Sequence, residues 1–261
     1  RLSLVGSEMC IRDRYAEILK KHFKKEGIAT DYIIDDVNQP TGTALIFVAD
    51  SGENCIAVAP GANYSLLPGS IIHFSKVIDE ADIIVMQAEI PYETIKRIAL
   101  LAKQKGKKVL FNPAPACLID EELMKAIDIL VVNELEAAFI SGIEYTGNNL
   151  EEIALSLLQA GARNAVITLG SQGVYMKNDK EIIQLPGYKV NAIDTIAAGD
   201  TFCGALAVIC AQREIDRDAL SFANAAAAIA VTRSGAQPSI PTLDEVKHFM
   251  LEKELALSFN F

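Results

Sequence analysis

The sequence has little of the residue types that mark several common kinds of site. It has no tryptophan, three histidines, and five cysteines that stand far apart without a CxxC pair or a Cys/His cluster. This spacing excludes an ordinary zinc site, and no GxSxG serine is present to form a triad with a histidine. Neither a Walker A motif nor a GxGxxG motif occurs, which argues against P-loop NTPases and ordinary dinucleotide folds.

Long apolar runs and long basic runs are missing as well. The apolar runs, such as GALAVICA and ANAAAAIAV, are too short to cross a bilayer. The net charge is −10, so nucleic acid and anionic membrane surfaces are poor partners. Because the cysteines are scattered and no signal peptide is visible, we expect a cytoplasmic protein with reduced thiols.

What is present suits one large α/β domain. The chain has 261 residues, of which 51% are hydrophobic and 22% charged, enough for a sizeable core. The opening RLSLVGSEMCIRDR, residues 1–14, has neither a helical nor a strand period and resembles the translation of a sequencing adapter. We therefore interpret residues 1–14 as a non-native segment and residues 15–261 as the domain; a genuine disordered or cleaved end is the alternative.

Hydrophobic periodicity predicts the order of the elements. An amphipathic helix ends at Gly27, and two β-rich runs around DSGEN predict a hairpin within residues 41–60. Apolar strands then alternate with helices, a pattern typical of a parallel sheet covered on both faces. The strands are expected at 82–87, 107–112, 128–133 and 164–170, and the helices near 91–105, 134–141 and 150–160. An antiparallel hairpin (GVYMKND, EIIQLPG) and helices near 199–212, 216–231 and 242–254 follow.

Polar residues and glycines collect where the predicted strands end. Ligands of open parallel sheets bind beyond the carboxyl ends of the strands, so these segments predict one composite site. The segments are residues 87–89, 112–113, 133–136, 168–173 and 194–200.

The AAGD segment is the strongest candidate for chemistry. The backbone N–H groups of Ala197, Ala198, Gly199 and Asp200 fall in or near the first turn of an apolar helix, where they can bind a phosphoryl group. Asp200 could accept a proton from a substrate hydroxyl while the amides stabilise the transferring charge. An aspartate near a helix start is also a common cap, and the motif alone leaves both interpretations open.

Three weaker candidates accompany it. The TLGSQG turn could hold phosphates with its amides, although an ordinary β-turn is the simpler interpretation. Asn133 and Glu136 could organise Mg²⁺-bound water, or they could only start a helix. Glu89 could bind sugar hydroxyls, or it could be a solvated loop carboxylate.

At NAIDTIAAGDTFCGAL the chain resembles the PfkB (ribokinase) family of sugar and nucleoside kinases. The resemblance continues through PTGTALIFV, LFNPAPA, NELEAAFISG, VITLGSQGVY and FANAAAAIAVTRSGAQPSIP, from Tyr15 to the last helix. It implies a three-layer αβα sandwich with a mostly parallel central sheet and a small β lid at about residues 32–60. The lid of such proteins often pairs two subunits, so the resemblance also implies a homodimer.

The resemblance implies ATP-dependent phosphorylation of D-ribose at its 5-hydroxyl, with Mg²⁺ and with K⁺ as a monovalent activator. Asp200 would be the base, residues 197–199 the anion hole, Glu89 a sugar ligand, and Glu136 a Mg²⁺ ligand through water. The implied ATP-binding residues are Asn133, Thr168, Leu169, Gly170, Ser171, Gln172, Gly173, Gly199, Asp200 and Asn224. The implied potassium ligands are Asp194, Ile196, Ala230, Arg233, Gly235 and Ser239.

Two alternatives and one departure from the family remain. The chain could be another sugar or nucleoside kinase of this family, or a non-catalytic nucleotide-binding relative. Members of the family carry a block before the YAEILKKHF helix that holds the first sheet strand and much of the sugar-binding segment, and this sequence does not match it. We therefore expect the first sheet strand to be missing, ribose affinity to be largely lost, and the chain as written to be a poor kinase and poorly stable.

Overall fold

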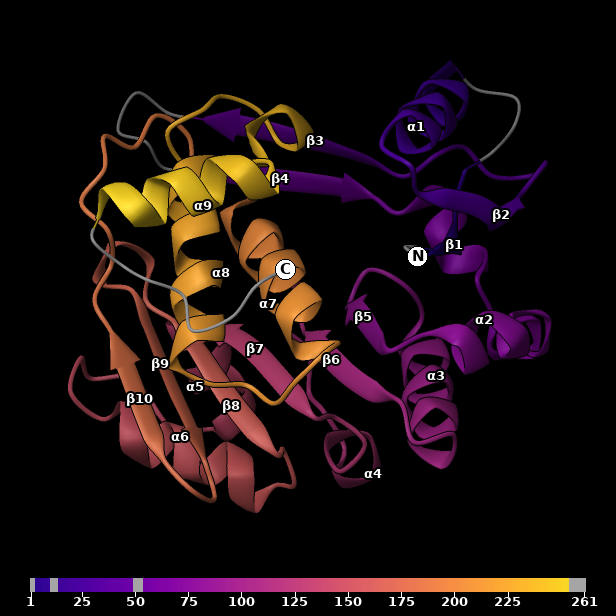
Figure 1. Cartoon of the computed structure of the whole chain (residues 1–261). Coiled ribbons are helices and arrows are strands. Elements are labelled where there is room, and N and C mark those ends of the chain that lie inside the picture. Colours follow the sequence, from indigo (N-terminus) through magenta and orange to yellow (C-terminus); the bar gives the residue numbers. More distant parts are fainter. Residues whose placement is uncertain (1–2, 10–13, 49–53, 254–261) are drawn as a thin grey trace. The chain divides into compact units, whose positions relative to one another are not determined.

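The computed structural model describes residues 3–9, 14–48 and 54–253 (Figure 1). The chain divides into two compact units. The first unit comprises Arg1–Ala81 and Ala88–Leu101, and the second comprises Asp82–Gln87 and Ala102–Phe261.

The first unit begins with a parallel strand pair and a helix. Strand β1 (Ser3–Met9) pairs with β2 (Ala29–Asp35), and helix α1 (Arg14–Lys25) lies between them in sequence. The sequence shows no strand period over residues 1–14, so β1 differs from that expectation. The pairing of β1 with β2 is irregular, because its register shifts between Ser3 and Val5 and again between Gly6 and Met9.

A predicted hairpin follows. Strands β3 (Thr43–Val48) and β4 (Asn54–Ala59) pair antiparallel, with Leu45 opposite Ala57, and the expected turn at DSGEN lies mostly outside the described residues. Leu45 and Val58 are exposed apolar side chains on this hairpin. The remaining elements of this part of the chain are η1 (Gly61–Ser65), η2 (Pro68–Phe74), α2 (Ser75–Glu80) and α3 (Tyr92–Gln104).

The second unit contains a sheet of six described strands in the order β10-β9-β8-β7-β6-β5. The pairs from β5 to β8 are parallel, whereas β9 and β10 run antiparallel as the sequence predicts for the hairpin. The strands are β5 (Ile83–Gln87), β6 (Lys108–Asn112), β7 (Ile129–Asn133), β8 (Asn164–Thr168), β9 (Val174–Asn178) and β10 (Ile182–Leu185). The predicted mostly parallel sheet is thereby confirmed.

Helices cover both faces of this sheet (Figure 1). On one face, Leu110, Val131 and Val166 join a core with the buried sides of three helices. These are α7 (Ala198–Cys210), α8 (Arg217–Ala230) and α9 (Leu243–Glu252). Alternate strand residues such as Phe111 and Val132 are also buried and face the other side, because side chains alternate along a strand. There α5 (Glu134–Ser141) and α6 (Leu150–Gln159) pack; α4 (Glu121–Met124), η3 (Gly170–Gln172) and η4 (Gln237–Ser239) are short connections.

The helices in the described part of the chain are short. The longest, α8, has 14 residues, whereas a span of the bilayer needs about 20. Within the described residues, no helix has both the length and the apolar character that crossing a membrane requires.

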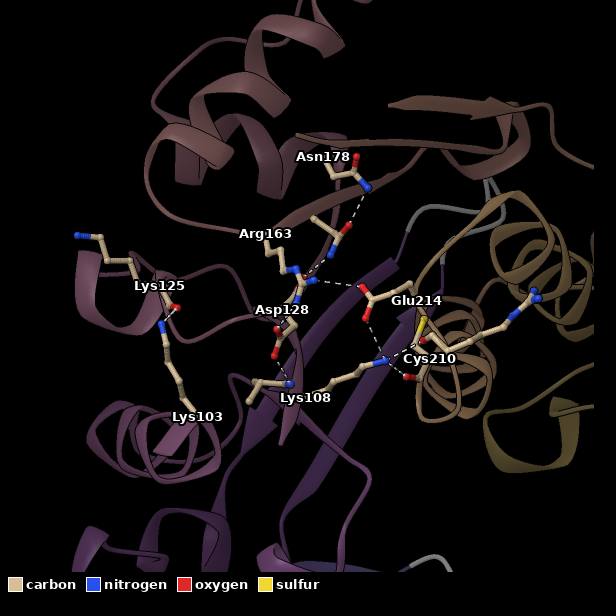
Figure 2. Close-up of polar contacts among 11 residues, drawn as sticks. Lys103, Lys108, Lys125, Asp128, Arg163, Asn178, Cys210 and Glu214 are labelled. Atoms are coloured by element: carbon tan, nitrogen blue, oxygen red, sulfur yellow. Dashed lines mark hydrogen bonds and ion pairs between the residues drawn. The ribbon is translucent and has the colours of Figure 1, made fainter. Parts of the chain in front are cut away.

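Charged residues at the amino ends of the strands in the second unit form a network of hydrogen bonds and ion pairs (Figure 2). Lys108, the first residue of β6, donates from Nζ to the backbone oxygens of Cys210 (2.9 Å) and Arg213 (2.8 Å) at the end of α7. Arg163 lies 3.6 Å from Asp128 and 3.4 Å from Glu214, and Glu214 lies 3.6 Å from Lys108. Because a cation near the last carbonyls of a helix is favourable, Lys108 fixes the end of α7 to the sheet.

Candidate active site

Four neighbouring strands of the second unit each end on a polar residue. Gln87 pairs with Asn112 across β5 and β6, and Asn133 pairs with Thr168 across β7 and β8. Asn112 donates to Val131 O at 2.8 Å, and the Thr168 hydroxyl donates to Val132 O at 3.3 Å. The carboxyl ends of these strands therefore form one polar edge, as the sequence predicts.

Helix α7 begins at this part of the second unit with a distorted turn. Its N-cap residue is Ala197, which has φ 60° in the left-handed region and makes no side-chain cap bond. The Ala198 N–H donates to Thr195 O at 3.3 Å, and the Thr201 N–H starts the helical ladder by donating to Ala197 O at 2.9 Å. Gly199 and Asp200 lie between them, in the first turn, where N–H groups have no acceptor within the helix.

The surroundings of this turn leave room for a ligand. A Cβ atom added to Gly199 would meet no heavy atom within 4 Å, so the backbone there can be approached closely. Ala197 keeps a conformation that costs an L-residue about 1–2 kcal/mol, and such strain is concentrated at functional sites. Three of the four predicted anion-binding amides lie in α7. The amide of Ala198 already donates to Thr195 O, whereas those of Gly199 and Asp200 lie in the open first turn.

Asp200 is exposed, and its carboxylate has a defined partner. It is the third residue of α7, so it is not the N-cap, and the capping interpretation of the sequence is not what the structure shows. The Gln87 amide donates from Nε2 to Asp200 Oδ1 at 2.9 Å. The base candidate therefore stands beside open helix amides with one of its two oxygens held.

Asp194 joins two loops of the second unit. Its Oδ1 accepts from the Ile196 N–H at 3.0 Å, and its Oδ2 accepts from the Gly235 N–H at 2.9 Å. The bond from Gly235, which has the larger effect, and the bond from Ile196 both stabilise the ionised form of Asp194. They hold the pKa of its carboxyl below the usual value. Val231 O also accepts from Ile193 N at 2.7 Å and Asp194 N at 3.2 Å, so the loop before α7 is fixed to the end of α8.

Three other predicted potassium ligands are Ala230, the last residue of α8, and Arg233 and Ser239, which lie between α8 and α9. The Ser239 side chain is buried and donates to Ala236 O at 2.6 Å. Arg233 pairs with Glu245 of α9 at 2.6 Å, which together with the Thr242 N–H lowers the pKa of Glu245 to about 2. Ala230 O accepts from Arg233 N at 3.0 Å. The structure thus ties the segments carrying Asp194, Ile196, Gly235 and Arg233 together through hydrogen bonds and one ion pair.

Asn133 and Glu136 form a capping box at the start of α5. The Asn133 side chain accepts from the Glu136 N–H at 2.8 Å, and Glu136 Oε2 accepts from the Asn133 N–H at 2.9 Å. Burial raises the pKa of Glu136, and the neighbouring Glu134 raises it further, against the lowering effect of the bond from Asn133. The helix-start interpretation is confirmed; the roles in ATP and Mg²⁺ binding stay predictions.

The TLGSQG turn is a tight 3₁₀ turn. A Cβ atom added to Gly173, at φ 101°, would lie 2.1 Å from Leu185 O, and one added to Gly187 would lie 2.2 Å from Ser171 O. Both glycines are therefore needed for close backbone packing against the end of β10. The predicted nucleotide residues Gly170, Ser171 and Gln172 are exposed on this turn, whereas Leu169 is buried.

Two further predicted residues have different surroundings. Asn224 is buried on α8 and donates from Nδ2 to Pro186 O at 3.0 Å, so its amide nitrogen holds the segment after β10. Glu89 is exposed and belongs to the first unit, whereas Asp200 belongs to the second. Their roles toward ATP and sugar stay predictions.

Gln87 is the residue that sequence reasoning missed. The sequence predicts a strand end at residues 87–89, where only Glu89 has an expected role. The available signal was a single amide side chain directly after the apolar run DIIVM. Nothing in the sequence indicates that this amide meets a carboxylate 113 residues away.

Comparisons with known proteins show the family of the chain. The sequence profile described as pfkB family carbohydrate kinase matches residues 12–243. The chain is 40% identical over 236 residues to a ribokinase of Staphylococcus aureus, covering 90% of this chain and 78% of that protein. It is 32% identical to a deoxyribokinase of Salmonella typhi, covering 91% and 78%. A structure of Arabidopsis thaliana ribokinase complexed with ribose and ATP superposes with a TM-score of 0.87 at 27% identity, covering 99% of this chain and 82% of that one.

Proposed function

Because the chain belongs to the pfkB family of carbohydrate kinases, we propose that it transfers the γ-phosphoryl group of ATP to the 5-hydroxyl of D-ribose. The names of its relatives, ribokinase among them, support the substrate. The observation that carries the proposal is the start of α7, where an exposed carboxylate stands next to helix amides with open space in front of them.

The residues of this turn fit phosphoryl transfer. Asp200 accepts the proton of the sugar hydroxyl while the hydroxyl oxygen forms a bond to the γ-phosphorus of ATP. The bond between this phosphorus and the bridging oxygen breaks, and ADP leaves with that oxygen. The N–H groups of Gly199 and Asp200, at the positive end of the helix dipole, stabilise the charge on the transferring oxygens. These amides are fixed before the substrate arrives, so no reorganisation is needed during the reaction.

Mg²⁺ fits the chemistry of Glu136. One carboxylate oxygen caps α5, and a carboxylate has lone pairs to spare for a metal-bound water. When bound with ATP, Mg²⁺ would neutralise phosphate charge. The exposed turn 170–172 and the Asn133 side chain would contact the nucleotide, and Asn224 would support them from α8.

K⁺ fits the loops joined by Asp194. The predicted donors are oxygens, which suit a hard monovalent cation, and one carboxylate already holds the two loops together. A bound cation would supply positive charge behind the anion-binding turn. The ligands we propose are the carboxylate of Asp194, the hydroxyl of Ser239 and backbone oxygens of Ile196, Ala230, Arg233 and Gly235.

We also propose pairing of two subunits through the β3–β4 lid and a cytoplasmic location. The exposed Leu45 and Val58 on the hairpin support the first, because apolar side chains on a strand pair favour association. The free thiols of Cys117, Cys203 and Cys210 support the second, because reducing compartments preserve thiols.

The test is a coupled ADP-release assay with a panel of D-ribose, 2-deoxy-D-ribose, D-fructose and adenosine, with mass spectrometry of the product. The proposal predicts ribose-dependent ADP release and a pentose phosphate, whereas the absence of a ribose response would favour the sequence-based expectation that this chain has lost its ribose affinity. Preference for 2-deoxy-D-ribose or another acceptor would favour a different kinase of the family. ATP binding without release toward any acceptor would favour a non-catalytic nucleotide-binding protein.

The cation site needs a second readout. K⁺ should raise both turnover and the melting temperature relative to tetramethylammonium at equal ionic strength, and Asp194→Ala should remove both responses. A wild-type chain whose melting temperature and turnover ignore K⁺ would refute the site.

A further inference from the structure

The hydrogen bond between Gln87 and Asp200 joins two distant parts of the second unit at the reacting carboxylate. Gln87 is the last residue of β5, and its Nε2 lies 2.9 Å from Asp200 Oδ1 across 113 residues of sequence. Its backbone is held in register opposite Asn112 of β6, and the preceding Met86 is buried. The amide is therefore presented from a fixed strand, whereas the carboxylate is exposed at the first turn of a helix.

We propose that Gln87 is a positioning residue for Asp200 in phosphoryl transfer, an inference that rests on the proposed function. An ionised carboxylate can only accept hydrogen bonds, so the amide must turn its nitrogen toward Asp200. This bond holds Oδ1 and leaves Oδ2 as the oxygen that meets the sugar hydroxyl. Without it, the exposed aspartate would be free to populate other rotamers in water, and ordering it during the reaction would raise the barrier.

Gln87 neither donates nor accepts a proton in the proposed reaction. The sugar O–H bond breaks and its proton passes to Asp200, the sugar O–P bond forms, and the P–O bond to ADP breaks. The amide keeps its hydrogens throughout, because an amide is too weak an acid to give one up at neutral pH. Its contribution is geometric, so its loss should slow the chemical step without weakening nucleotide binding.

Asn112 offers a matched control on the neighbouring strand. It also ends a parallel strand, but its amide donates to the backbone oxygen of Val131 at 2.8 Å and not to Asp200. Gln87→Met removes the amide of Gln87 and keeps an unbranched side chain of similar length. Asn112→Leu removes the amide of Asn112 in a comparable way. A general effect of losing a polar strand end would appear in both variants.

The experiment measures kcat and KM for ATP and ribose in the full chain and in the variants Gln87→Met, Asn112→Leu, Asp200→Ala and Gln87→Met/Asp200→Ala. We expect Gln87→Met to lower kcat by about tenfold or more and to change KM for ATP less than twofold. In the Asp200→Ala background the same change should lower the residual rate less than twofold, because the partner it positions is gone. Asn112→Leu should lower kcat per folded molecule clearly less than Gln87→Met does, because the amide of Asn112 bonds to Val131 O and not to Asp200.

The outcomes separate this inference from the proposed function. Near-normal turnover of Asp200→Ala would overturn the role of Asp200 itself. Loss of turnover in Asp200→Ala with normal turnover in Gln87→Met would overturn only the inference. An equal loss caused by Gln87→Met in both backgrounds would show a structural role and would also overturn it.

If turnover is too slow to measure, the interaction of Gln87 with Asp200 can be tested by protein stability instead. The urea midpoints of four of these proteins (wild type, Gln87→Met, Asp200→Ala and the double variant) report whether the two side chains interact in the folded state. We expect the midpoint shifts of Gln87→Met and Asp200→Ala not to add in the double variant. Additive shifts would mean that the side chains act independently, and the positioning role would be refuted.

Discussion

The two ends of helix α7 differ in almost every respect. At the amino end, Ala197 is strained, Gly199 faces open space and Asp200 is exposed. At the carboxyl end, Ile209 and Cys210 are buried, and Lys108 donates to the backbone oxygen of Cys210, the last residue of the helix, and to that of Arg213 in the turn after it (Figure 2). The carboxyl end of α7 is therefore fixed to the amino ends of the strands. Its amino end is strained and accessible, and it lies at the carboxyl ends of the strands.

The largest expected effect lies at the amino end. Asp200→Asn should cut turnover by at least ~10²-fold, because it removes the general base while preserving the shape of the side chain. The urea midpoint should fall by no more than the loss of the single hydrogen bond from Gln87 accounts for, since Asp200 is exposed and does not cap the helix. Retained turnover in this variant would take Asp200 out of the mechanism, and a large fall in the midpoint would show that this end also carries stability.

The opposite expectation holds for the carboxyl end. Lys108→Met should lower the free energy of unfolding by about 1.5–3 kcal/mol, because two backbone oxygens lose a charged donor. Urea unfolding measures this loss, and turnover per folded molecule should fall less than about threefold. Lys103→Met is the matched control: it removes a lysine that donates to a single carbonyl, that of Lys125, away from α7. An unchanged midpoint for Lys108→Met would contradict the account of this end.

The two cysteines of α7 report on its ends separately. Burial raises the pKa of Cys203 and of Cys210 to about 12, so both thiols should react slowly near pH 7.5, where the thiolate is scarce. In a background with the other cysteines replaced by serine, Lys108→Met should raise the alkylation rate of Cys210 by about tenfold, as loss of ~1.4 kcal/mol of local stability implies. Cys203 should respond much less, and an equal rise at both thiols would indicate that α7 opens as one unit.

The smallest expected effect concerns the strained alanine. Ala197→Gly should raise the free energy of unfolding by about 0.5–1 kcal/mol, because glycine adopts the left-handed conformation without a Cβ penalty. Ala198→Gly, one residue later and inside the helix, should lower it by up to about 1 kcal/mol. Urea unfolding of both variants should therefore give shifts of opposite sign, and shifts of the same sign would show that Ala197 is not strained.

Much of the second unit could be predicted from the sequence, because its elements are strongly periodic. The strands ending at Gln87, Asn112 and Asn133 and the helix beginning at Ala198 fall within two residues of their expected positions. Continuous apolar runs separated by helical patterns leave few arrangements other than a covered parallel sheet. Strand β1 could not be predicted, because the letters SLVGSEM show no regular alternation of apolar and polar residues on which such a prediction rests.

The site could be predicted only in outline. The sequence places Asp200 and the glycine-containing turns at strand ends, but it does not show which side chains meet there. The bond from Gln87 to Asp200 and the bond from Gly235 to Asp194 each depend on how distant segments pack. The same is true of the bond from Asn224 to Pro186, which shows that a predicted nucleotide residue also supports a neighbouring loop.

The most direct test of the central claim is residue-resolved amide hydrogen exchange along α7, with and without Mg²⁺ and a non-hydrolysable ATP analogue. We expect the nucleotide to slow the fast exchange of the Gly199 and Asp200 amides, because these first-turn amides bind phosphate. We expect no early change at Ile209 and Cys210, which are already buried and bonded. Protection that develops only at the carboxyl end, or at neither end, would contradict the assignment of the phosphoryl site to the start of α7.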